Sequence, residues 1–217
     1  MTKTKTRSKD ASRLMVEFPP SAYCDLKHNF PLIAYDIDML CEGTKKLATF
    51  MRRLREQSRE NPDHFDPDTY MGWGFECFVE SLIHQFESDS RVYIQDYTPV
   101  QHDDYGVDGV GYGIGGDVHT VQCKARTDNT RMLNDLDDHL SNFVAHSACR
   151  YKVDCCKDGL QPMTVFTTAA GIRRETATKT YDNKVRCINY KQLRILVDKN
   201  EMFWKKFRDQ MKLRKAQ

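Results

Sequence analysis

Apolar side chains recur every three or four residues in several stretches of the chain, and elsewhere they form short runs next to glycine or proline. Helical spacing, as for Leu40, Leu47, Phe50 and Leu54, predicts a helix because such residues share one face. The predicted helices cover residues 35–60, 73–87, 130–147, 173–181, 190–197 and 201–214. The short runs predict strands at residues 91–97, 107–113, 118–125, 163–169 and 184–188.

The order of these elements indicates the fold class. Gly115-Gly116 separates the second and third predicted strands and is typical of a tight hairpin turn. The later strands alternate with helices, which favours parallel pairing. The sequence therefore predicts an α/β fold in which a mixed β-sheet is flanked by helices.

Proline pairs and charge divide the chain into four predicted parts. Residues 1–20 form a flexible basic arm that ends at Pro19-Pro20, and residues 21–68 form an N-terminal helical extension. The core spans residues 69–200, and a basic C-terminal helix follows at 201–217. We expect the apolar stripe of that last helix, formed by Phe203, Phe207 and Met211, to pack into the core.

Composition restricts the class of protein. The chain has 217 residues, of which 40% are hydrophobic and 29% charged, so it can bury a core. No apolar run approaches the roughly 18–20 residues that cross a bilayer, and the first residues lack the apolar segment of a secretory signal. We expect an intracellular protein without a membrane partner, cytoplasmic or, in a eukaryotic host, nuclear. Its eight cysteines are then expected to be reduced thiols.

The net charge of +2 conceals an uneven distribution. Residues 1–10 carry a net +3 and residues 203–217 a net +5, so the remaining residues sum to −6. Basic ends around an acidic middle suit a chain that contacts polyanions and holds cations on its carboxylates, although a solvated surface would show the same balance.

The candidate chemistry lies in Asp104–Asp108 and in Gln122-Cys123-Lys124. Because side chains alternate along a strand, Gln122 and Lys124 share a face, and a neighbouring strand can bring Asp108 beside them. Carboxylate and amide oxygens suit Mg²⁺, and a lysine can orient the attacking water and offset phosphate charge. The glycines after Asp108 would let a phosphate backbone approach closely. On the preceding predicted helix, Glu76, Glu80 and His84 follow one another at intervals of about one turn, on one face.

The chain resembles the Mrr-like branch of the PD-(D/E)xK nuclease superfamily, which has a restriction-endonuclease-like fold. The resemblance covers roughly residues 70–198 and rests on an ordered set of motifs: GWGFE at 72–76, DYGVD at 104–108, VQCK at 121–124, VFTT at 165–168 and CINYKQL at 187–193. It implies an αβββαβ core for residues 69–200. It also implies metal-dependent cleavage of DNA.

Residue roles follow from the resemblance position by position. Asp108, Gln122 and the main-chain carbonyl of Cys123 would hold the metal, Lys124 would be the catalytic lysine and Glu76 would complete the site. Asp104 would be an auxiliary acid. Glu80, one helical turn after Glu76, is a further candidate auxiliary acid, although a solvated helix face would also explain it. The expected cofactor is Mg²⁺, for which Mn²⁺ can substitute, and the expected partner is double-stranded DNA. Pairing of two copies of the chain into a homodimer is compatible with this scheme.

Phosphate contacts are expected from basic residues outside the catalytic set. Four arginines follow predicted strand ends, and the last helix carries a basic face. These residues are Arg126, Arg131, Arg173, Arg174, Lys205, Lys206, Lys212, Arg214 and Lys215.

Two other functions remain open at this point. The chain could be a nuclease-fold DNA-binding module that has lost activity, although the intact Asp108, Gln122, Lys124 and Glu76 argue against that. It could also be an interaction protein in which residues 1–68 and 201–217 act and the core is a scaffold. The sequence does not separate restriction, homing or mobile-element, and repair roles.

Overall fold

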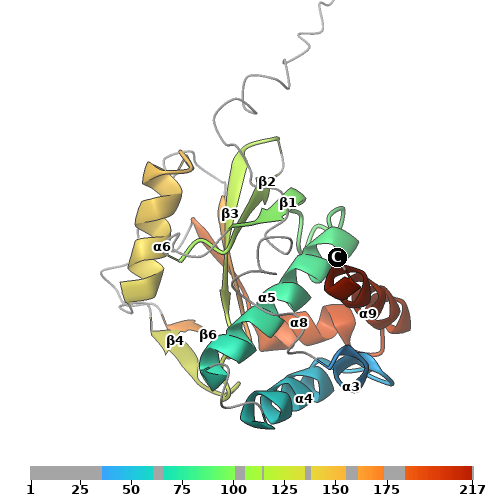
Figure 1. The fold of residues 1–217 in the computed structure, drawn as a ribbon. Helices are drawn as coiled ribbons and strands as arrows, with labels where there is room; N and C mark the ends of the chain where they lie inside the picture. The colour runs from blue at the N-terminus through green and yellow to red at the C-terminus, as the bar shows by residue number, and fades with distance from the viewer. Residues whose placement is uncertain are drawn as a thin grey trace, which may run out of the picture.

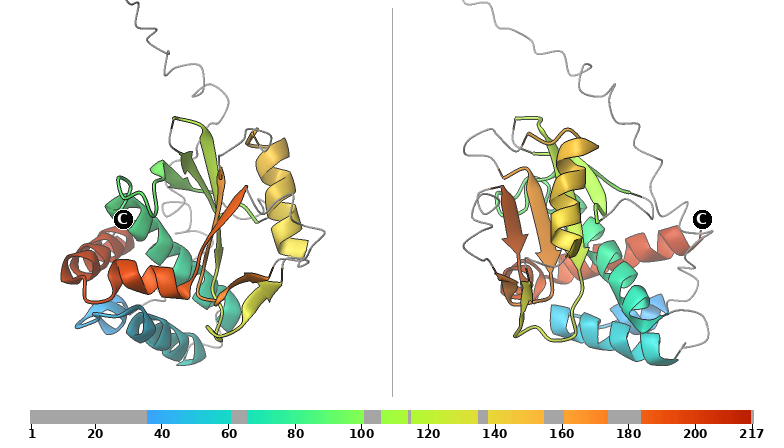
Figure 2. Two further views of the ribbon diagram at one scale, coloured as in Figure 1. Left: turned by 180° about the vertical axis from the view of Figure 1, so that it is seen from behind. Right: turned by 90° about the vertical axis from the view of Figure 1, so that its left-hand side faces the viewer.

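The computed structural model describes residues 36–60, 66–100, 106–113, 115–134, 138–154, 161–173 and 184–216. Its centre is a five-stranded mixed sheet with helices on both faces, which confirms the predicted fold class at that level (Figure 1). Helix α6 covers one face, and the other helices cover the opposite face (Figure 2). Within the described residues, no helix is long and apolar enough to cross a bilayer.

The sheet has the strand order β1-β2-β3-β5-β7. Strands β1 (Gln95–Pro99), β2 (Gly109–Tyr112) and β3 (Val118–Lys124) pair antiparallel, and the predicted β2–β3 hairpin is confirmed. Strands β5 (Met163–Thr167) and β7 (Val185–Ile188) continue the sheet parallel to β3. The carboxyl ends of β3, β5 and β7 therefore lie at one edge of the sheet.

Helix α5 (Pro67–Gln85) begins earlier than its apolar spacing predicts. Asp66 caps its first turn by accepting the Thr69 amide at 3.0 Å, and Pro67 occupies the first helical position, where its missing N–H is not needed. Gly74 lets helix α4 (Leu47–Glu60) approach, because a Cβ there would lie 2.5 Å from a methyl carbon of Leu54. The Asp66-Pro67 pair thus starts a helix, as well as marking the end of the segment before it.

The N-terminal and C-terminal helices share a core with α5. Helices α3 (Ile37–Cys41), α4, α8 (Tyr190–Val197) and α9 (Glu201–Ala216) bury side chains in the same hydrophobic cluster as α5 and one face of the sheet. Phe203, Phe207 and Met211 are all buried there, so the expected packing role of the α9 stripe is confirmed. A second cluster lies between α6 (Asp138–Cys149) and the other face of the sheet.

One predicted helix is partly wrong. Residues 132–134 form strand β4 (Met132–Asn134), which pairs parallel with β6 (Gly171–Arg173), and α6 starts only at Asp138. The pairing partner lies about forty residues away, so a local apolar period cannot reveal it. Strand β1 also starts later than expected, because residues 89–94 form turns. The helix predicted at 173–181 lies mostly outside the described residues.

Phe78 on α5 is the centre of the aromatic core. Its ring lies 5.6 Å from Phe50, 5.8 Å from Phe75 and 5.5 Å from Phe203, measured between centroids. We expect Phe78→Ala to destabilise the fold by about 3–5 kcal/mol, the usual cost of a buried aromatic truncation. Urea unfolding would measure this, with Met202→Ala as the control, since Met202 is 61% exposed on α9. Equal midpoints for the two variants would contradict the shared core.

Candidate active site

Asp108 lies immediately before β2, at the point where that strand stops pairing with β3. Its amide donates to the Val121 carbonyl at 2.9 Å, and its carboxylate accepts the Cys123 amide at 2.5 Å. The Asp108 side chain thus takes over a hydrogen bond that a continuing strand would make with its main chain. This fixes the carboxylate against the end of β3.

The two faces of β3 differ, and the packing shows which residues face which way. Val121 and Cys123 belong to the hydrophobic cluster that contains α5, whereas the Thr120 hydroxyl bonds to Ser147 of α6 at 2.8 Å. Alternation therefore directs Gln122, which is 1% exposed, and Lys124 to the face opposite Cys123. Asp108 precedes Gly109, which pairs with Val121, and the Asp108 amide also bonds to the Val121 carbonyl, so Asp108 lies beside β3 where the regular pairing ends. Asp108 and the segment Gln122-Cys123-Lys124 therefore lie at the same end of β3.

Two threonines hold the end of β3. Thr167 donates its hydroxyl to the Lys124 carbonyl at 2.8 Å, and the Thr168 amide donates to the same oxygen at 3.2 Å. The Thr168 hydroxyl accepts the Arg126 amide at 2.6 Å. These contacts make Thr167 and Thr168 positioning residues for Lys124, a role that the VFTT motif does not reveal without the strand pairing.

Glu76 brings a second carboxylate to the same place from α5. Burial, together with the charge of Asp108, raises its pKa from 4.5 to about 8, while Lys124 acts in the opposite direction. The charges of Asp108 and Lys124 both act on the pKa of Glu76, so the three groups lie within electrostatic reach of one another. A cation between the two carboxylates would relieve their repulsion.

The raised pKa of Glu76 has a consequence for stability. The folded state keeps a proton that the unfolded state loses above pH 4.5, so this group's contribution to stability falls as the pH rises from about 4.5 to 8. In metal-free buffer we expect the wild-type free energy of unfolding to fall by up to about 1.4 kcal/mol per pH unit in that window. Glu76→Gln should remove this pH dependence. Urea unfolding across this pH range would measure it, with the exposed Glu87→Gln as control. Parallel pH profiles for wild type and Glu76→Gln would contradict the placement.

Tyr97 on β1 is a site residue that the sequence did not single out. Its hydroxyl donates to the Asp108 carbonyl at 3.5 Å, and its buried ring crosses Gly109, where a Cβ would lie 2.1 Å from the hydroxyl oxygen. A Cβ at Gly111 would lie 2.7 Å from the Gln95 carbonyl. For Gly109 and Gly111 the prediction that the glycines admit a phosphate backbone is therefore wrong, because these two admit β1. The alternating glycines of Gly109–Gly113 are the sequence feature from which this close approach of β1 could have been predicted.

Glu80 and Asp104 were the predicted auxiliary acids. Glu80 is buried on α5, with its Oε1 3.8 Å from Nε2 of the more exposed His84, and His84 stands edge-on to the Tyr97 ring. The charge of Glu80 contributes to the raised pKa of Tyr97, after burial and Cys123. Glu80 therefore borders the site from the Tyr97 side. Asp104 lies outside the described residues.

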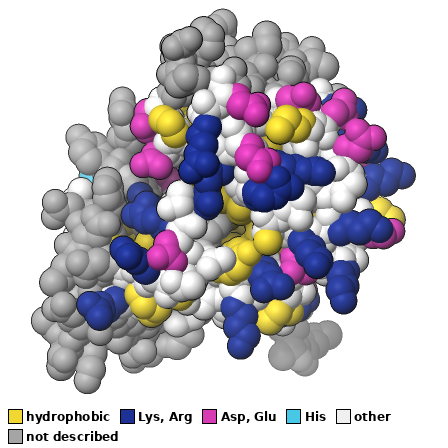
Figure 3. All heavy atoms as spheres, turned by 90° about the horizontal axis from the view of Figure 1, so that it is seen from below, with side chains coloured by type: hydrophobic (Ala, Val, Ile, Leu, Met, Phe, Trp, Pro, Cys, Tyr) yellow, Lys and Arg dark blue, Asp and Glu magenta, His cyan; other side chains and the backbone are white. Residues whose placement is uncertain are grey.

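The predicted DNA-contacting residues fall in two places. Arg126, Arg131 and Arg173 are exposed near the carboxyl edge of the parallel strands, and Arg131 pairs with Asp128 at 3.0 Å. Seen from that end of the molecule, Lys and Arg side chains are numerous, with Asp and Glu between them (Figure 3).

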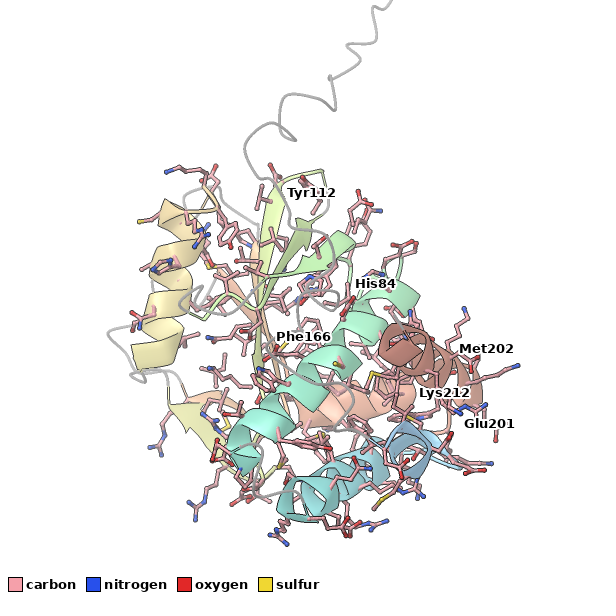
Figure 4. The ribbon with its side chains drawn as sticks, viewed as in Figure 1. His84, Tyr112, Phe166, Glu201, Met202 and Lys212 are labelled. Atoms are coloured by element: carbon pink, nitrogen blue, oxygen red, sulfur yellow. The ribbon has the colours of Figure 1, made fainter. Side chains whose placement is uncertain are left out.

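The basic residues of α9 lie elsewhere. This helix packs against α3 and α5, in the helical layer on one side of the sheet, and Lys212 forms an ion pair with Asp38 (Figure 4). Lys205 and Lys206 are exposed on the same helix. The structure therefore does not bring these lysines together with Lys124. Arg174 and the side chains of Arg214 and Lys215 lie outside the described part.

Metal-binding chemistry in the described residues is limited to a small set of donors. No group of three or more His, Cys, Asp or Glu side chains there is arranged to hold an ion. Glu76 and Asp108 supply two carboxylates, so a cation would also need the Gln122 amide or a main-chain carbonyl. Cys41, Cys77, Cys123, Cys149 and Cys187 are free thiols, as expected for the described cysteines.

Comparison with known proteins adds no identification. The sequence matches no protein-family model, and no match was found among curated proteins.

Proposed function

We propose that the chain is a Mg²⁺-dependent deoxyribonuclease with a restriction-endonuclease-like core of the PD-(D/E)xK type. The observation that supports this most is that Asp108 is bonded to the Cys123 amide at the end of β3, and that Asp108 and Lys124 both act on the pKa of Glu76 from α5. A nuclease of this type needs carboxylates that hold a metal and a lysine beside them. The order Glu76, Asp108, Lys124 along this chain is also the order of such residues in the Mrr-like branch.

The donors fit a hard divalent cation. The Cys123 amide points to Asp108, and in an extended strand the carbonyl of the same residue leaves the backbone on the same side, so it is directed toward that carboxylate. Carboxylate, amide and carbonyl oxygens are the ligands that Mg²⁺ takes, with waters in the remaining positions. The bound ion would polarise the phosphate and lower the pKa of its water.

The side chains of this site supply binding and orientation. The Asp108 carboxylate is held by the Cys123 amide, and α5 supplies Glu76 as the second carboxylate. Lys124 places an ammonium group where it can donate hydrogen bonds to a phosphate oxygen or to the attacking water. Its charge offsets the negative charge that develops on the phosphate in the transition state. We expect 5′-phosphate and 3′-hydroxyl products from double-stranded DNA.

A plasmid-nicking assay tests the proposal. Supercoiled DNA should be nicked in Mg²⁺ or Mn²⁺ and remain intact in excess chelator. Intact plasmid in both conditions, with DNA binding that weakens steeply as salt rises, would replace the proposal by an inactive DNA-binding module. Absence of both cleavage and binding would favour an interaction protein.

A further inference from the structure

A cavity opens at the end of the sheet opposite Lys124, beside the β2–β3 turn. Its volume is about 110 Å³, several times what one water needs and enough for a small anion, and it is partly open to solvent. Tyr112, at the end of β2, marks this end of the sheet in Figure 4. From Val118 at the cavity to Lys124, strand β3 extends for about 20 Å, so the cavity is separate from the candidate active site.

Arg186 of β7 forms one wall of this cavity. Its Nε donates to the Thr164 hydroxyl at 3.3 Å, and its Nη2 donates to the Val92 carbonyl. Burial lowers the pKa of the guanidinium, and among the described residues no Asp or Glu forms an ion pair with it. A partly buried cation without an acidic partner is costly, and an anion in the cavity would compensate for it.

The groups around Arg186 can add hydrogen bonds without adding positive charge. His119 is buried with Nε2 2.8 Å from the Thr164 hydroxyl, and burial, reinforced by Arg186, lowers its pKa to about 3, so the ring stays neutral. Ser90 and Gln161 also line the cavity and offer a hydroxyl and an amide. Asp117 is on the wall as well.

The loop beside the cavity contains a residue in a strained backbone conformation. Tyr93, which lines it, has a φ of +37°, a conformation that an aromatic residue rarely adopts. The turn brings the Val92 carbonyl to Arg186 and places Ser90 at the cavity. Local strain of this kind concentrates at ligand sites, because a stable neighbourhood must hold it.

From these observations we propose that the Arg186 cavity binds a small molecule through a phosphate or carboxylate group, with Arg186 as the charged partner. This site does not depend on the proposed nuclease activity. It lies at the other end of β3 and uses none of the same residues.

The test is thermal unfolding of the Lys124→Ala chain, in which phosphate binding at the candidate active site is weakened. Inorganic phosphate and acetate serve as separate probes, each titrated at constant ionic strength against chloride. We expect a saturable rise in melting temperature with at least one probe, and the more effective one identifies the anionic group. Arg186→Gln should weaken the apparent affinity at least tenfold, whereas Arg194→Gln, which removes an exposed arginine on α8, should leave it unchanged.

A second pair of variants avoids the structural role of Arg186. Ser90→Ala and Gln161→Ala keep the contacts of the guanidinium to Thr164 and Val92, and each should weaken the same probe severalfold. The absence of a saturable effect with either probe would overturn the proposal. An equal effect in the Lys124→Ala chain with and without Arg186→Gln, Ser90→Ala or Gln161→Ala would also overturn it, because the anion would then bind elsewhere.

Discussion

Lys124→Ala should reduce the cleavage rate by about 100- to 10,000-fold, the usual contribution of a positioned catalytic side chain. The ammonium group acts on the charge that develops during reaction, so its loss affects the cleavage step more than DNA affinity. The fold should persist, because Thr167 and Thr168 bond to the main-chain carbonyl of Lys124, which alanine retains.

Single-turnover cleavage at saturating protein would measure the effect, together with DNA affinity in a chelator. Lys191→Ala provides the matched control, since it removes an exposed lysine from α8. Cleavage by Lys124→Ala at close to the wild-type rate would show that Lys124 is not catalytic. An equal loss in Lys191→Ala would point to a general effect of charge.

Asp108→Asn should abolish cleavage and weaken Mg²⁺ or Mn²⁺ binding by at least tenfold. Asparagine has nearly the same shape, and its amide oxygen can still accept the Cys123 amide, so the end of β3 should keep its geometry. What is lost is one of the two carboxylate charges at the site. The remaining carboxylate and neutral oxygens bind a hard cation less tightly.

Calorimetry with Mn²⁺ would measure the affinity, and Asp209→Asn, an exposed carboxylate on α9, is the control. Asp108→Asn also has an independent readout, because removing the Asp108 charge should lower the pKa of Glu76. Unchanged metal affinity together with an unchanged Glu76 pKa would exclude Asp108 from the site.

Much of the fold could be predicted from local patterns. The β2–β3 hairpin, the strand at β5 and the buried stripe of α9 each follow from a turn signal or an apolar period within a few residues. The position of Asp108 beside the end of β3 followed from a hairpin alone. These features depend on contacts between residues close in the sequence.

What the sequence did not predict depends on distant contacts. The β4–β6 pair joins Met132 to Gly171, and nothing near Met132 in the sequence distinguishes it from a helix start. The close approach of Tyr97 to Gly109 and the hold of Thr167 on Lys124 are set by strand packing. The Arg186 cavity combines residues from a loop, a hairpin and two strands, which no single motif records.

The measurement that tests the central claim most directly is the cleavage rate as a function of Mg²⁺ concentration, for wild type, Asp108→Asn and Lys124→Ala prepared in the same way. The account predicts saturable Mg²⁺ dependence for the wild type, no recovery of Lys124→Ala at any concentration, and at most weak activity of Asp108→Asn at the highest concentrations. Equal cleavage by all three proteins, or none by the wild type at any Mg²⁺ or Mn²⁺ concentration, would contradict it.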